Sequence, residues 1–440
     1  MKQRSPQLIA FLTVAIDLLG FGIVLPLLPL YGDHFMGGIP KEYHGLTIGG
    51  LLSSFSLMQF LFAPGWGRLS DRVGRRPILI IGLAGSVAFY TLFGYATYIQ
   101  SLALLFVARI GAGIAGATIG TAQAVIADST TPEKRARGMA LIGVAFGVGF
   151  TFGPLIGSLF ASEVAGSAMS AAPGFVAAGL SLVALILAMA LLPETRPLGG
   201  DTKPRPWFNL EGWRFALGHR SIAVPLLTFF CATIAFGNFE GTLARFVKYE
   251  LKYTLREMGF IFAYIGLVLM LVQGLIVRKL VTRTGEVIMC VLGIGLMLAG
   301  LIVMGAAITT DALTFVEVPL SSGGSRTELA TSSLALVLGM LAVAVSGFAF
   351  LTPSAQALVS RRTSALRQGE VLGVNQAASA IARILGPLMG NVLYGSQENP
   401  HAAWPFYGGG ILLGVALLLA LSMLHQREPV DSQTKPAVGH

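Results

Sequence analysis

Charged residues are scarce in this sequence. Only 12% of its 440 residues are Asp, Glu, Lys or Arg, while 54% are hydrophobic. A soluble globular domain carries about twice that share of charge. So few charges exclude a water-soluble globule, and the apolar surface must instead face lipid. We therefore expect a membrane protein that lies in the lipid bilayer.

Cysteines and the usual catalytic groupings are sparse as well. Cys231 and Cys290, the two cysteines, both lie in apolar stretches, which argues against a disulfide framework or a thiolate metal site. The sequence contains no recognisable nucleophile–base set, phosphate-binding loop or metal-ligand cluster. Residues 111–116 match GxGxxG, but they lie within an apolar segment that no strand precedes. We expect neither an enzyme, nor a metal or cofactor, nor a nucleic-acid partner.

Long apolar runs dominate the chain. A membrane-spanning helix needs about 20 mostly apolar residues, and the sequence offers twelve such runs. The first follows a basic start but continues to about Tyr31, which is too long for the apolar region of a signal peptide. The expected spans are 7–31, 46–67, 77–98, 101–127, 138–161, 172–193, 221–247, 256–278, 286–308, 332–359, 369–395 and 403–425.

Two polar stretches interrupt this pattern. Residues 194–220 are Pro-rich and basic and divide six spans from six, while residues 310–331 contain SSGGS and predict a flexible loop. The sequence therefore predicts an all-α polytopic membrane protein of two pseudo-symmetric six-helix bundles. The predicted units are a first bundle at 1–193, a cytoplasmic linker at 194–220, a second bundle at 221–428 and a cytoplasmic tail at 429–440.

Lysine and arginine are distributed unevenly between the loops. Most of them fall on one side of the expected spans, whereas Lys41, Lys248, Lys252, Arg256 and Arg326 fall on the other. Because basic residues accumulate on the cytoplasmic side of membrane proteins, we expect both termini in the cytoplasm. The expected location is the inner membrane of the cell.

The segment between the second and third spans, residues 67–77, reads GRLSDRVGRRP. Its glycines permit a tight turn. Asp71 can lie at the N-terminus of a helix across the interface between the two bundles, where the helix macrodipole favours an anion. The two arginines that precede Pro77 are placed to pair with an acid at a neighbouring helix end, for which Asp128 is the candidate. The segment resembles the signature loop of the major facilitator superfamily, which implies a cytoplasmic gate. The gate residues are then Gly67, Asp71, Arg72, Gly74, Arg75, Arg76 and Asp128.

The second half contains weaker copies of these segments, as expected for a transporter with internal repeats. Residues 274–285, GLIVRKLVTRTG, occupy the equivalent position between spans eight and nine but lack the Asp. Residues 127–138 are mirrored loosely by 360–369. The alternative interpretation of the first-half segment is a basic loop that serves membrane topology alone.

The fifth span has a series of small residues that leave one helix face bare. It resembles the antiporter motif of drug:proton exchangers, which implies a smooth, bent helix at the interface of the halves. Gly386-Pro387 repeats the pattern in the eleventh span, and the alternative is plain small-residue packing. The motif residues are Gly143, Gly147, Gly149, Gly153, Pro154 and Gly157.

Four charged residues fall well inside the expected spans, away from the span ends. Arg109 lies about 12 Å from the outer end of its helix, at a depth where an arginine needs a partner. Asp17 reaches a similar depth and is the expected partner, in a pair that either loads and releases a proton or is static. Glu240 is a second proton-site candidate, or else part of a salt bridge with Arg245 or Lys248. Arg383 either binds an anionic group of the substrate or pairs with Glu240.

Polar and aromatic side chains in the spans are candidates for contact with a small-molecule substrate, and for each of them the alternative is packing. They are Gln59, Asn238, Gln273, Gln356, Asn375, Gln376, Arg383, Phe21, Tyr90 and Tyr264.

Taken together, the chain resembles the drug:proton antiporter branch of the major facilitator superfamily, and most of all the tetracycline:proton antiporters. LPLLP at 25–29, LMQFLFAP at 57–64, IADST at 126–130 and TPSAQALVSR at 352–361 carry the resemblance. It implies efflux of a small amphipathic molecule or drug in exchange for protons, by alternating access in a monomer. The alternatives are a facilitator or proton symporter for a sugar or metabolite, and a non-transporting membrane sensor or scaffold.

Overall fold

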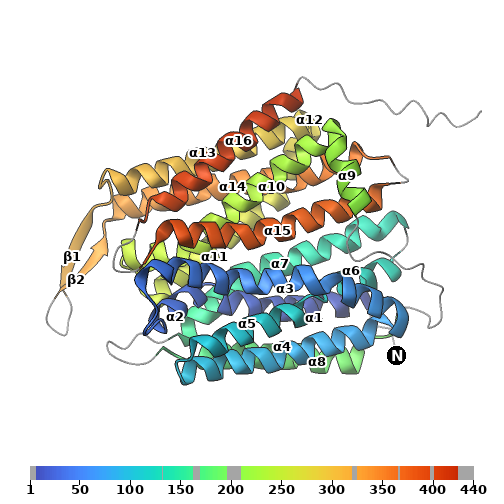
Figure 1. Ribbon diagram of the computed structural model, residues 1–440, viewed down its shortest axis with the longest axis horizontal. Coiled ribbons are helices and arrows are strands. Elements are labelled where there is room, and N and C mark those ends of the chain that lie inside the picture. Colours follow the sequence, from blue (N-terminus) through green and yellow to red (C-terminus); the bar gives the residue numbers. More distant parts are fainter. Residues whose placement is uncertain are drawn as a thin grey trace, which may run out of the picture.

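The computed structural model describes residues 6–130, 132–161, 169–195, 210–319, 325–364, 367–396 and 401–424. The regular secondary structure of these residues is helical apart from one short hairpin, so the predicted polytopic helical class is confirmed (Figure 1). Helices in lipid satisfy every backbone hydrogen-bonding group internally, and for this reason apolar runs of this length fold as helices.

Proline and glycine divide the first half into its helices. The first predicted span breaks after Val24, because Pro26 and Pro29 interrupt the helical hydrogen bonds, and the fourth breaks after Gly116. The third and fourth spans are separated at Ile99–Ser101, as predicted. The elements are α1 (Pro6–Val24), α2 (Leu28–His34), η1 (Lys41–Tyr43), α3 (His44–Val73), α4 (Arg75–Tyr98), α5 (Leu102–Gly116), α6 (Ile119–Asp128), α7 (Pro132–Phe160) and α8 (Ala172–Leu191).

The second half repeats this arrangement after a short connecting helix, α9 (Leu210–Gly218). The eighth predicted span is built from three consecutive helical pieces, with a π-helix in the middle. The elements are α10 (Arg220–Arg245), η2 (Phe246–Glu250), α11 (Leu255–Leu271), η3 (Val272–Val277), α12 (Arg278–Thr284), α13 (Glu286–Thr309), β1 (Phe315–Pro319), β2 (Ser325–Leu329), α14 (Thr331–Arg361), α15 (Gln368–Tyr394) and α16 (Trp404–Leu424).

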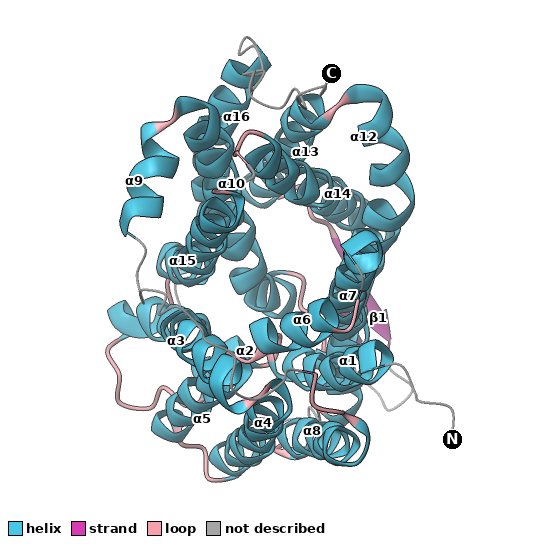
Figure 2. Ribbon diagram, turned by 90° about the vertical axis from the view of Figure 1, so that its right-hand side faces the viewer, coloured by secondary structure: helices cyan, strands magenta, loops and turns pink. Residues whose placement is uncertain are grey.

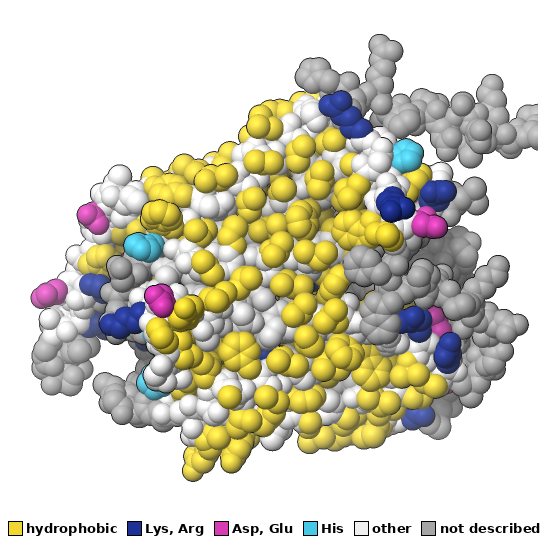
Figure 3. Space-filling model, in the orientation of Figure 1, with side chains coloured by type: hydrophobic (Ala, Val, Ile, Leu, Met, Phe, Trp, Pro, Cys, Tyr) yellow, Lys and Arg dark blue, Asp and Glu magenta, His cyan; other side chains and the backbone are white. Residues whose placement is uncertain are grey.

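Ten helical segments of the described chain are long and apolar enough to cross a membrane. The two remaining predicted spans are α7, which contributes a shorter apolar stretch at Val144–Phe160, and α15. That α7 and α15 also span the membrane, which would make twelve spans in all, therefore stays a prediction. On the face shown in Figure 3, apolar side chains cover the middle, and most of the charged side chains lie toward the two ends.

Two connections differ from the prediction. The expected linker holds helix α9, which packs Trp213 and Phe215 against the second bundle; residues 196–209 of the linker and the tail from 425 lie outside the described residues. In the expected flexible loop at 310–331, the described residues form two antiparallel strands in which Phe315 pairs with Leu329, while residues 320–324, with most of SSGGS, lie outside the described residues. Arg326 holds the hairpin to α11 through Glu257, with 2.6 Å between Nη2 and Oε2.

Figure 2 looks along the helices and shows the two halves beside each other, around a central region. We call one end of the molecule the arginine-rich end, since it carries Arg72, Arg75, Arg283 and Arg361. We call the other the hairpin end, since it carries β1 and β2 (Figure 1). The largest apolar core cluster includes side chains of both halves.

Candidate functional site

The halves meet mainly through two helix pairs, α3 with α15 and α7 with α11, and α2 also contacts α10. Toward the hairpin end these pairs approach backbone to backbone at glycines. A Cβ added to Gly49 of α3 would lie 2.7 Å from Leu388 Cα of α15, and one added to Gly266 of α11 would lie 2.8 Å from Thr151 Cα of α7. Both distances are too short for any side chain, so the halves are in tight contact at this end.

The same helix faces are bare toward the arginine-rich end. Gly67 lies about five turns from Gly49 on one face of α3, and Gly373 lies about five turns from Asn391 on one face of α15. A Cβ added to Gly67, to Gly373 or to Gly147 of α7 would have no atom within 4 Å. The described interface is therefore closed at the hairpin end and separated at the arginine-rich end.

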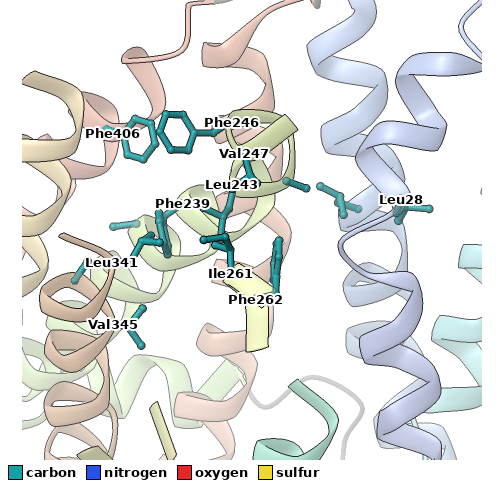
Figure 4. Close-up of a cluster of buried hydrophobic side chains, with 14 of the residues drawn as sticks. Leu28, Phe239, Leu243, Phe246, Val247, Ile261, Phe262, Leu341, Val345 and Phe406 are labelled. Carbon is teal, nitrogen blue, oxygen red and sulfur yellow. The ribbon is translucent and has the colours of Figure 1, made fainter. Parts of the chain in front are cut away.

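Apolar side chains complete the closure at the hairpin end. Leu28 of α2 belongs to the same buried cluster as Leu243 of α10 and Val247 of η2 (Figure 4). Ser53 of α3 also donates a hydrogen bond of 2.6 Å to the carbonyl oxygen of Ile384 on α15. Closure thus excludes water from a layer that belongs to both halves.

A buried ion pair lies within this layer and joins the two halves. Arg245 of α10 contacts Asp33 of α2 twice, at 2.9 Å from Nε to Oδ2 and 3.4 Å from Nη2 to Oδ1. The two side chains are 0% and 1% exposed. Arg245 also donates to the Gly395 carbonyl at 2.9 Å and lies over the Tyr394 ring, and Tyr249 donates to Asp33. A charge pair this well enclosed holds the hairpin end shut.

The sequence prediction missed this pair, because it considered Arg245 only as a partner for Glu240. In the structure Arg245 binds Asp33, so the suggested Arg245–Glu240 salt bridge is wrong. The signal available was an acid next to the end of the first apolar run and an arginine at the end of the seventh. Both lie at the same depth, and neither has an oppositely charged neighbour one helical turn away.

We expect Asp33→Ala to destabilise the closed hairpin end by about 3–5 kcal/mol, because it leaves Arg245 buried without its counter-charge. The double variant Asp33→Ala/Arg245→Ala removes both charges, so it should be more stable than either single variant. Thermal unfolding of the purified variants measures this coupling. If the loss of stability in the double variant equals the sum of the losses in the two single variants, the two residues do not act as a pair.

Asp17 lies midway along α1 and is held by hydroxyl groups. Ser181 of α8 donates to its Oδ1 at 3.0 Å, and Ser86 of α4 is a second hydroxyl partner. Within the described chain no cation forms an ion pair with this carboxyl. A carboxyl in a membrane span that lacks a cation is suited to being neutralised by a proton.

Arg109 of α5 is buried, with 2% of its surface exposed. Its guanidinium lies over the rings of Phe55, at 4.5 Å, and Phe21, at 5.8 Å. Its Nε and Nη1 have no hydrogen-bond partner among the described residues. The expected direct pair with Asp17 is therefore absent in this conformation, and Tyr90, which interacts electrostatically with both charges, is their shared neighbour.

Glu240 of α10 and Arg383 of α15 lie on adjacent helices of the second half and interact electrostatically. Among the described residues neither side chain makes a hydrogen bond or an ion pair. Arg383 is exposed and Glu240 is half-buried. The predicted Glu240–Arg383 contact is thus present only as a long-range attraction.

The predicted gate segment forms a compact cluster at the arginine-rich end. Arg75 contacts Asp71 at 2.7 Å and Asp128 at 3.2 Å, as expected for Asp128, and it also donates to Ser70. Glu194, placed in the linker by the sequence prediction, accepts the backbone N–H of Arg75 at 2.8 Å. It thereby caps the N-terminus of α4, where free N–H groups attract an anion.

One detail of the gate prediction needs correction, and another stays a prediction. Asp71 forms an ion pair with Arg75, and its expected place at a helix N-terminus across the interface of the halves stays a prediction. Arg76 donates to the carbonyl oxygen of Met189, whereas an acidic side chain was expected. Gly74 has a φ of +102°, which only glycine adopts easily, and this allows the sharp turn between α3 and α4. Arg72 is exposed, and the gating role stays a prediction.

The glycine face of α7 packs against α1. Positions for a Cβ on Gly149, Gly153 and Gly157 lie 2.6–2.7 Å from the backbone of Leu18, Gly22 and Ile23. As expected, α7 lies at the interface of the halves, where α11 contacts it at Thr151, Ser158 and the motif residue Pro154. The three glycines face α1 within the first bundle. The surroundings of Gly143 lie outside the described part.

The substrate candidates divide into packed and accessible residues. Asn238 is fully buried and donates to the Pro405 carbonyl, so the expectation that it faces the central region is wrong. Asn375 and Tyr90 are buried too, whereas Gln376 is exposed. Gln59 donates to the Gly116 carbonyl and Tyr264 to the Leu338 carbonyl. The partly exposed candidates are Gln59, Gln273, Gln356, Tyr264 and Phe21.

Two helical bundles with an interface closed at one end, and with charged residues buried in their spans, define a membrane transporter. The family model of the Major Facilitator Superfamily matches residues 10–325 and 320–439. The chain belongs to this family, whose members are transporters and not enzymes. It is therefore a multi-pass membrane protein that moves a small molecule.

Two curated relatives and one solved structure illustrate the likeness. The class C tetracycline resistance protein of Escherichia coli is 30% identical, over 95% of this chain and 96% of its own length. Major facilitator superfamily domain-containing protein 10 of Bos taurus is 29% identical, over 89% of each chain. The crystal structure of the human organic anion transporter MFSD10 (TETRAN) aligns with a TM-score of 0.63 at 24% identity, covering 96% of this chain and 100% of its own.

Proposed function

We propose that this transporter is a proton-coupled antiporter that exports a small amphipathic molecule by alternating access. The observation that carries the proposal is Asp17, a carboxyl in a membrane span that is held by hydroxyls and not by a cation. Such a group accepts a proton when it faces one side and releases it when Arg109 approaches. Similarity to tetracycline resistance proteins supports the export direction.

The two ends of the molecule then have distinct roles. The arginine-rich end faces the cytoplasm, because basic residues accumulate on that side, and substrate enters there while the hairpin end is closed. The Arg75 cluster closes the cytoplasmic side when the halves rock, and Glu240 is the second proton site. One monomer holds the whole pathway, and the proton is the only coupling ion.

The test is substrate-induced proton movement in proteoliposomes that contain a pH-sensitive dye. Dyes, antibiotics, organic anions and sugars are added in turn, and we expect one class of amphipathic compound to change the internal pH. Empty liposomes and liposomes treated with a protonophore are the controls. Compound flux without any pH change would overturn antiport and favour a facilitator, and co-movement of proton and compound in the same direction would indicate a symporter.

A further inference from the structure

Among the described residues, two opposite charges of the second half, Glu240 and Arg383, have no hydrogen-bonded or ion-paired partner. A charged side chain in a membrane span is costly and almost always pairs. These two lie on α10 and α15, which pack together through Gly241 and Pro387, with 2.9 Å between the position for a Gly241 Cβ and Pro387 Cα. They attract each other but form no ion pair in the described chain. A site with an exposed cation is thereby kept available for a ligand.

The same face of α15 extends this site toward the open end. Gln376 is exposed and precedes Arg383 by about two helical turns, so both side chains lie on one stripe. Since α15 begins at the arginine-rich end, a ligand that enters there meets Gln376 first and Arg383 next. The amide and the guanidinium both donate hydrogen bonds, and a guanidinium binds a carboxylate through two parallel N–H groups.

An aromatic wall adjoins these polar groups. Phe236 precedes Glu240 by one turn on α10, so the two side chains share a helix face. Its ring stacks on that of Phe348 from α14, with centroids 3.8 Å apart and 5° between the planes. Both rings are partly exposed. A flat apolar group fits against such a surface by offset stacking.

We propose that the second half carries a binding site for an aromatic carboxylate, with Arg383 and Gln376 holding the carboxylate and Phe236 and Phe348 contacting the ring. Glu240 stands beside the bound anion, and its negative charge opposes binding until a proton neutralises it. This inference names the substrate class of the site in the proposed function and rests on that function only for the direction of transport.

Binding of 2-naphthoate to the purified protein, measured by calorimetry without a proton gradient, tests the inference. Arg383→Gln should weaken the affinity about tenfold or more, because a charge-assisted hydrogen-bond pair is lost. Arg383→Lys keeps the charge but not the fork of donors, so it should weaken binding less. Glu240→Gln should strengthen binding. Arg367→Gln changes an exposed arginine in front of the same helix and should leave the affinity unchanged.

The neutral isostere 2-naphthamide separates charge recognition from apolar contact. We expect it to bind wild-type protein more weakly than 2-naphthoate and to be insensitive to Arg383→Gln. Equal affinities for the two compounds, or an unchanged 2-naphthoate affinity in Arg383→Gln, would overturn the inference. Thermal melting of each variant checks folding. A protein that binds 2-naphthoate but shows no proton flux refutes antiport alone, whereas proton flux with a compound that lacks an anionic group refutes this site alone.

Discussion

Asp17→Asn is expected to abolish proton-driven transport while substrate exchange at equal concentrations continues. Asn keeps the hydrogen bond from Ser181 and nearly the same volume, so the packing of α1 against α8 is retained. It cannot gain or lose a proton, and the coupled pH change should therefore fall to the level of empty liposomes. Exchange needs only the rocking of the two halves and remains possible.

The matched control is Asp311→Asn, an exposed acid at the hairpin end in a left-handed conformation that Asn also tolerates. It should transport like the wild type. Full proton coupling in Asp17→Asn would remove this carboxyl from the mechanism. A loss of exchange together with coupling, in a protein with unchanged melting temperature, would instead assign it to substrate binding.

The second large effect is expected from a single methyl group at the interface, in Gly49→Ala. The new Cβ would lie 2.7 Å from Leu388 Cα, an atom of the backbone that has no freedom to turn away. Overpacking of this kind costs about 1–3 kcal/mol, so the equilibrium should shift about five- to 150-fold toward a conformation with the hairpin end open. Transport, which must pass through the closed conformation, should slow accordingly.

Gly50→Ala provides the control one residue along the same helix, since a Cβ there would meet nothing closer than Phe106 at 3.9 Å. Spin labels on cysteines introduced at Tyr98 and Thr310, both exposed at the hairpin end, report the separation of the halves. Only Cys231 and Cys290 must first be replaced. An unchanged distance in Gly49→Ala would mean that α3 and α15 do not move apart when the transporter opens.

Ten of the spans and the ion pair of Arg75 with Asp128 could be predicted from the sequence, whereas the breaks inside the first, fourth and eighth spans were not predicted. Hydropathy locates helices, and proline and glycine locate their ends. The gate segment has enough fixed spacing to place Arg75 next to an acidic helix end. The hairpin was missed because its strands are only five residues long and follow a polar stretch.

Side-chain partners inside the bundles were harder to predict. Position in a span gives the depth of a residue in the membrane, but it does not give the direction in which the side chain points around the helix axis. Asp17 and Arg109 have similar depths, yet Arg109 turns toward Phe55 and Asp17 toward Ser181. For the same reason Asn238 was assigned to the central region although it faces α16. Asp33 and Arg245 lie 212 residues apart, and only the packing of the two halves brings them together.

The helix faces around Gly67 and Gly373 at the arginine-rich end make no close contact, and they offer a place for an inhibitor to bind. Gly67 and Gly373 have no atom within 4 Å of an added Cβ, although their counterparts at the hairpin end are in backbone contact. A small rigid wedge lodged between these faces would prevent α3 and α15 from meeting there and would trap the conformation described above. In the orientation proposed above, the arginine-rich end faces the cytoplasm, and an inhibitor of this type would then have to cross the membrane to reach it.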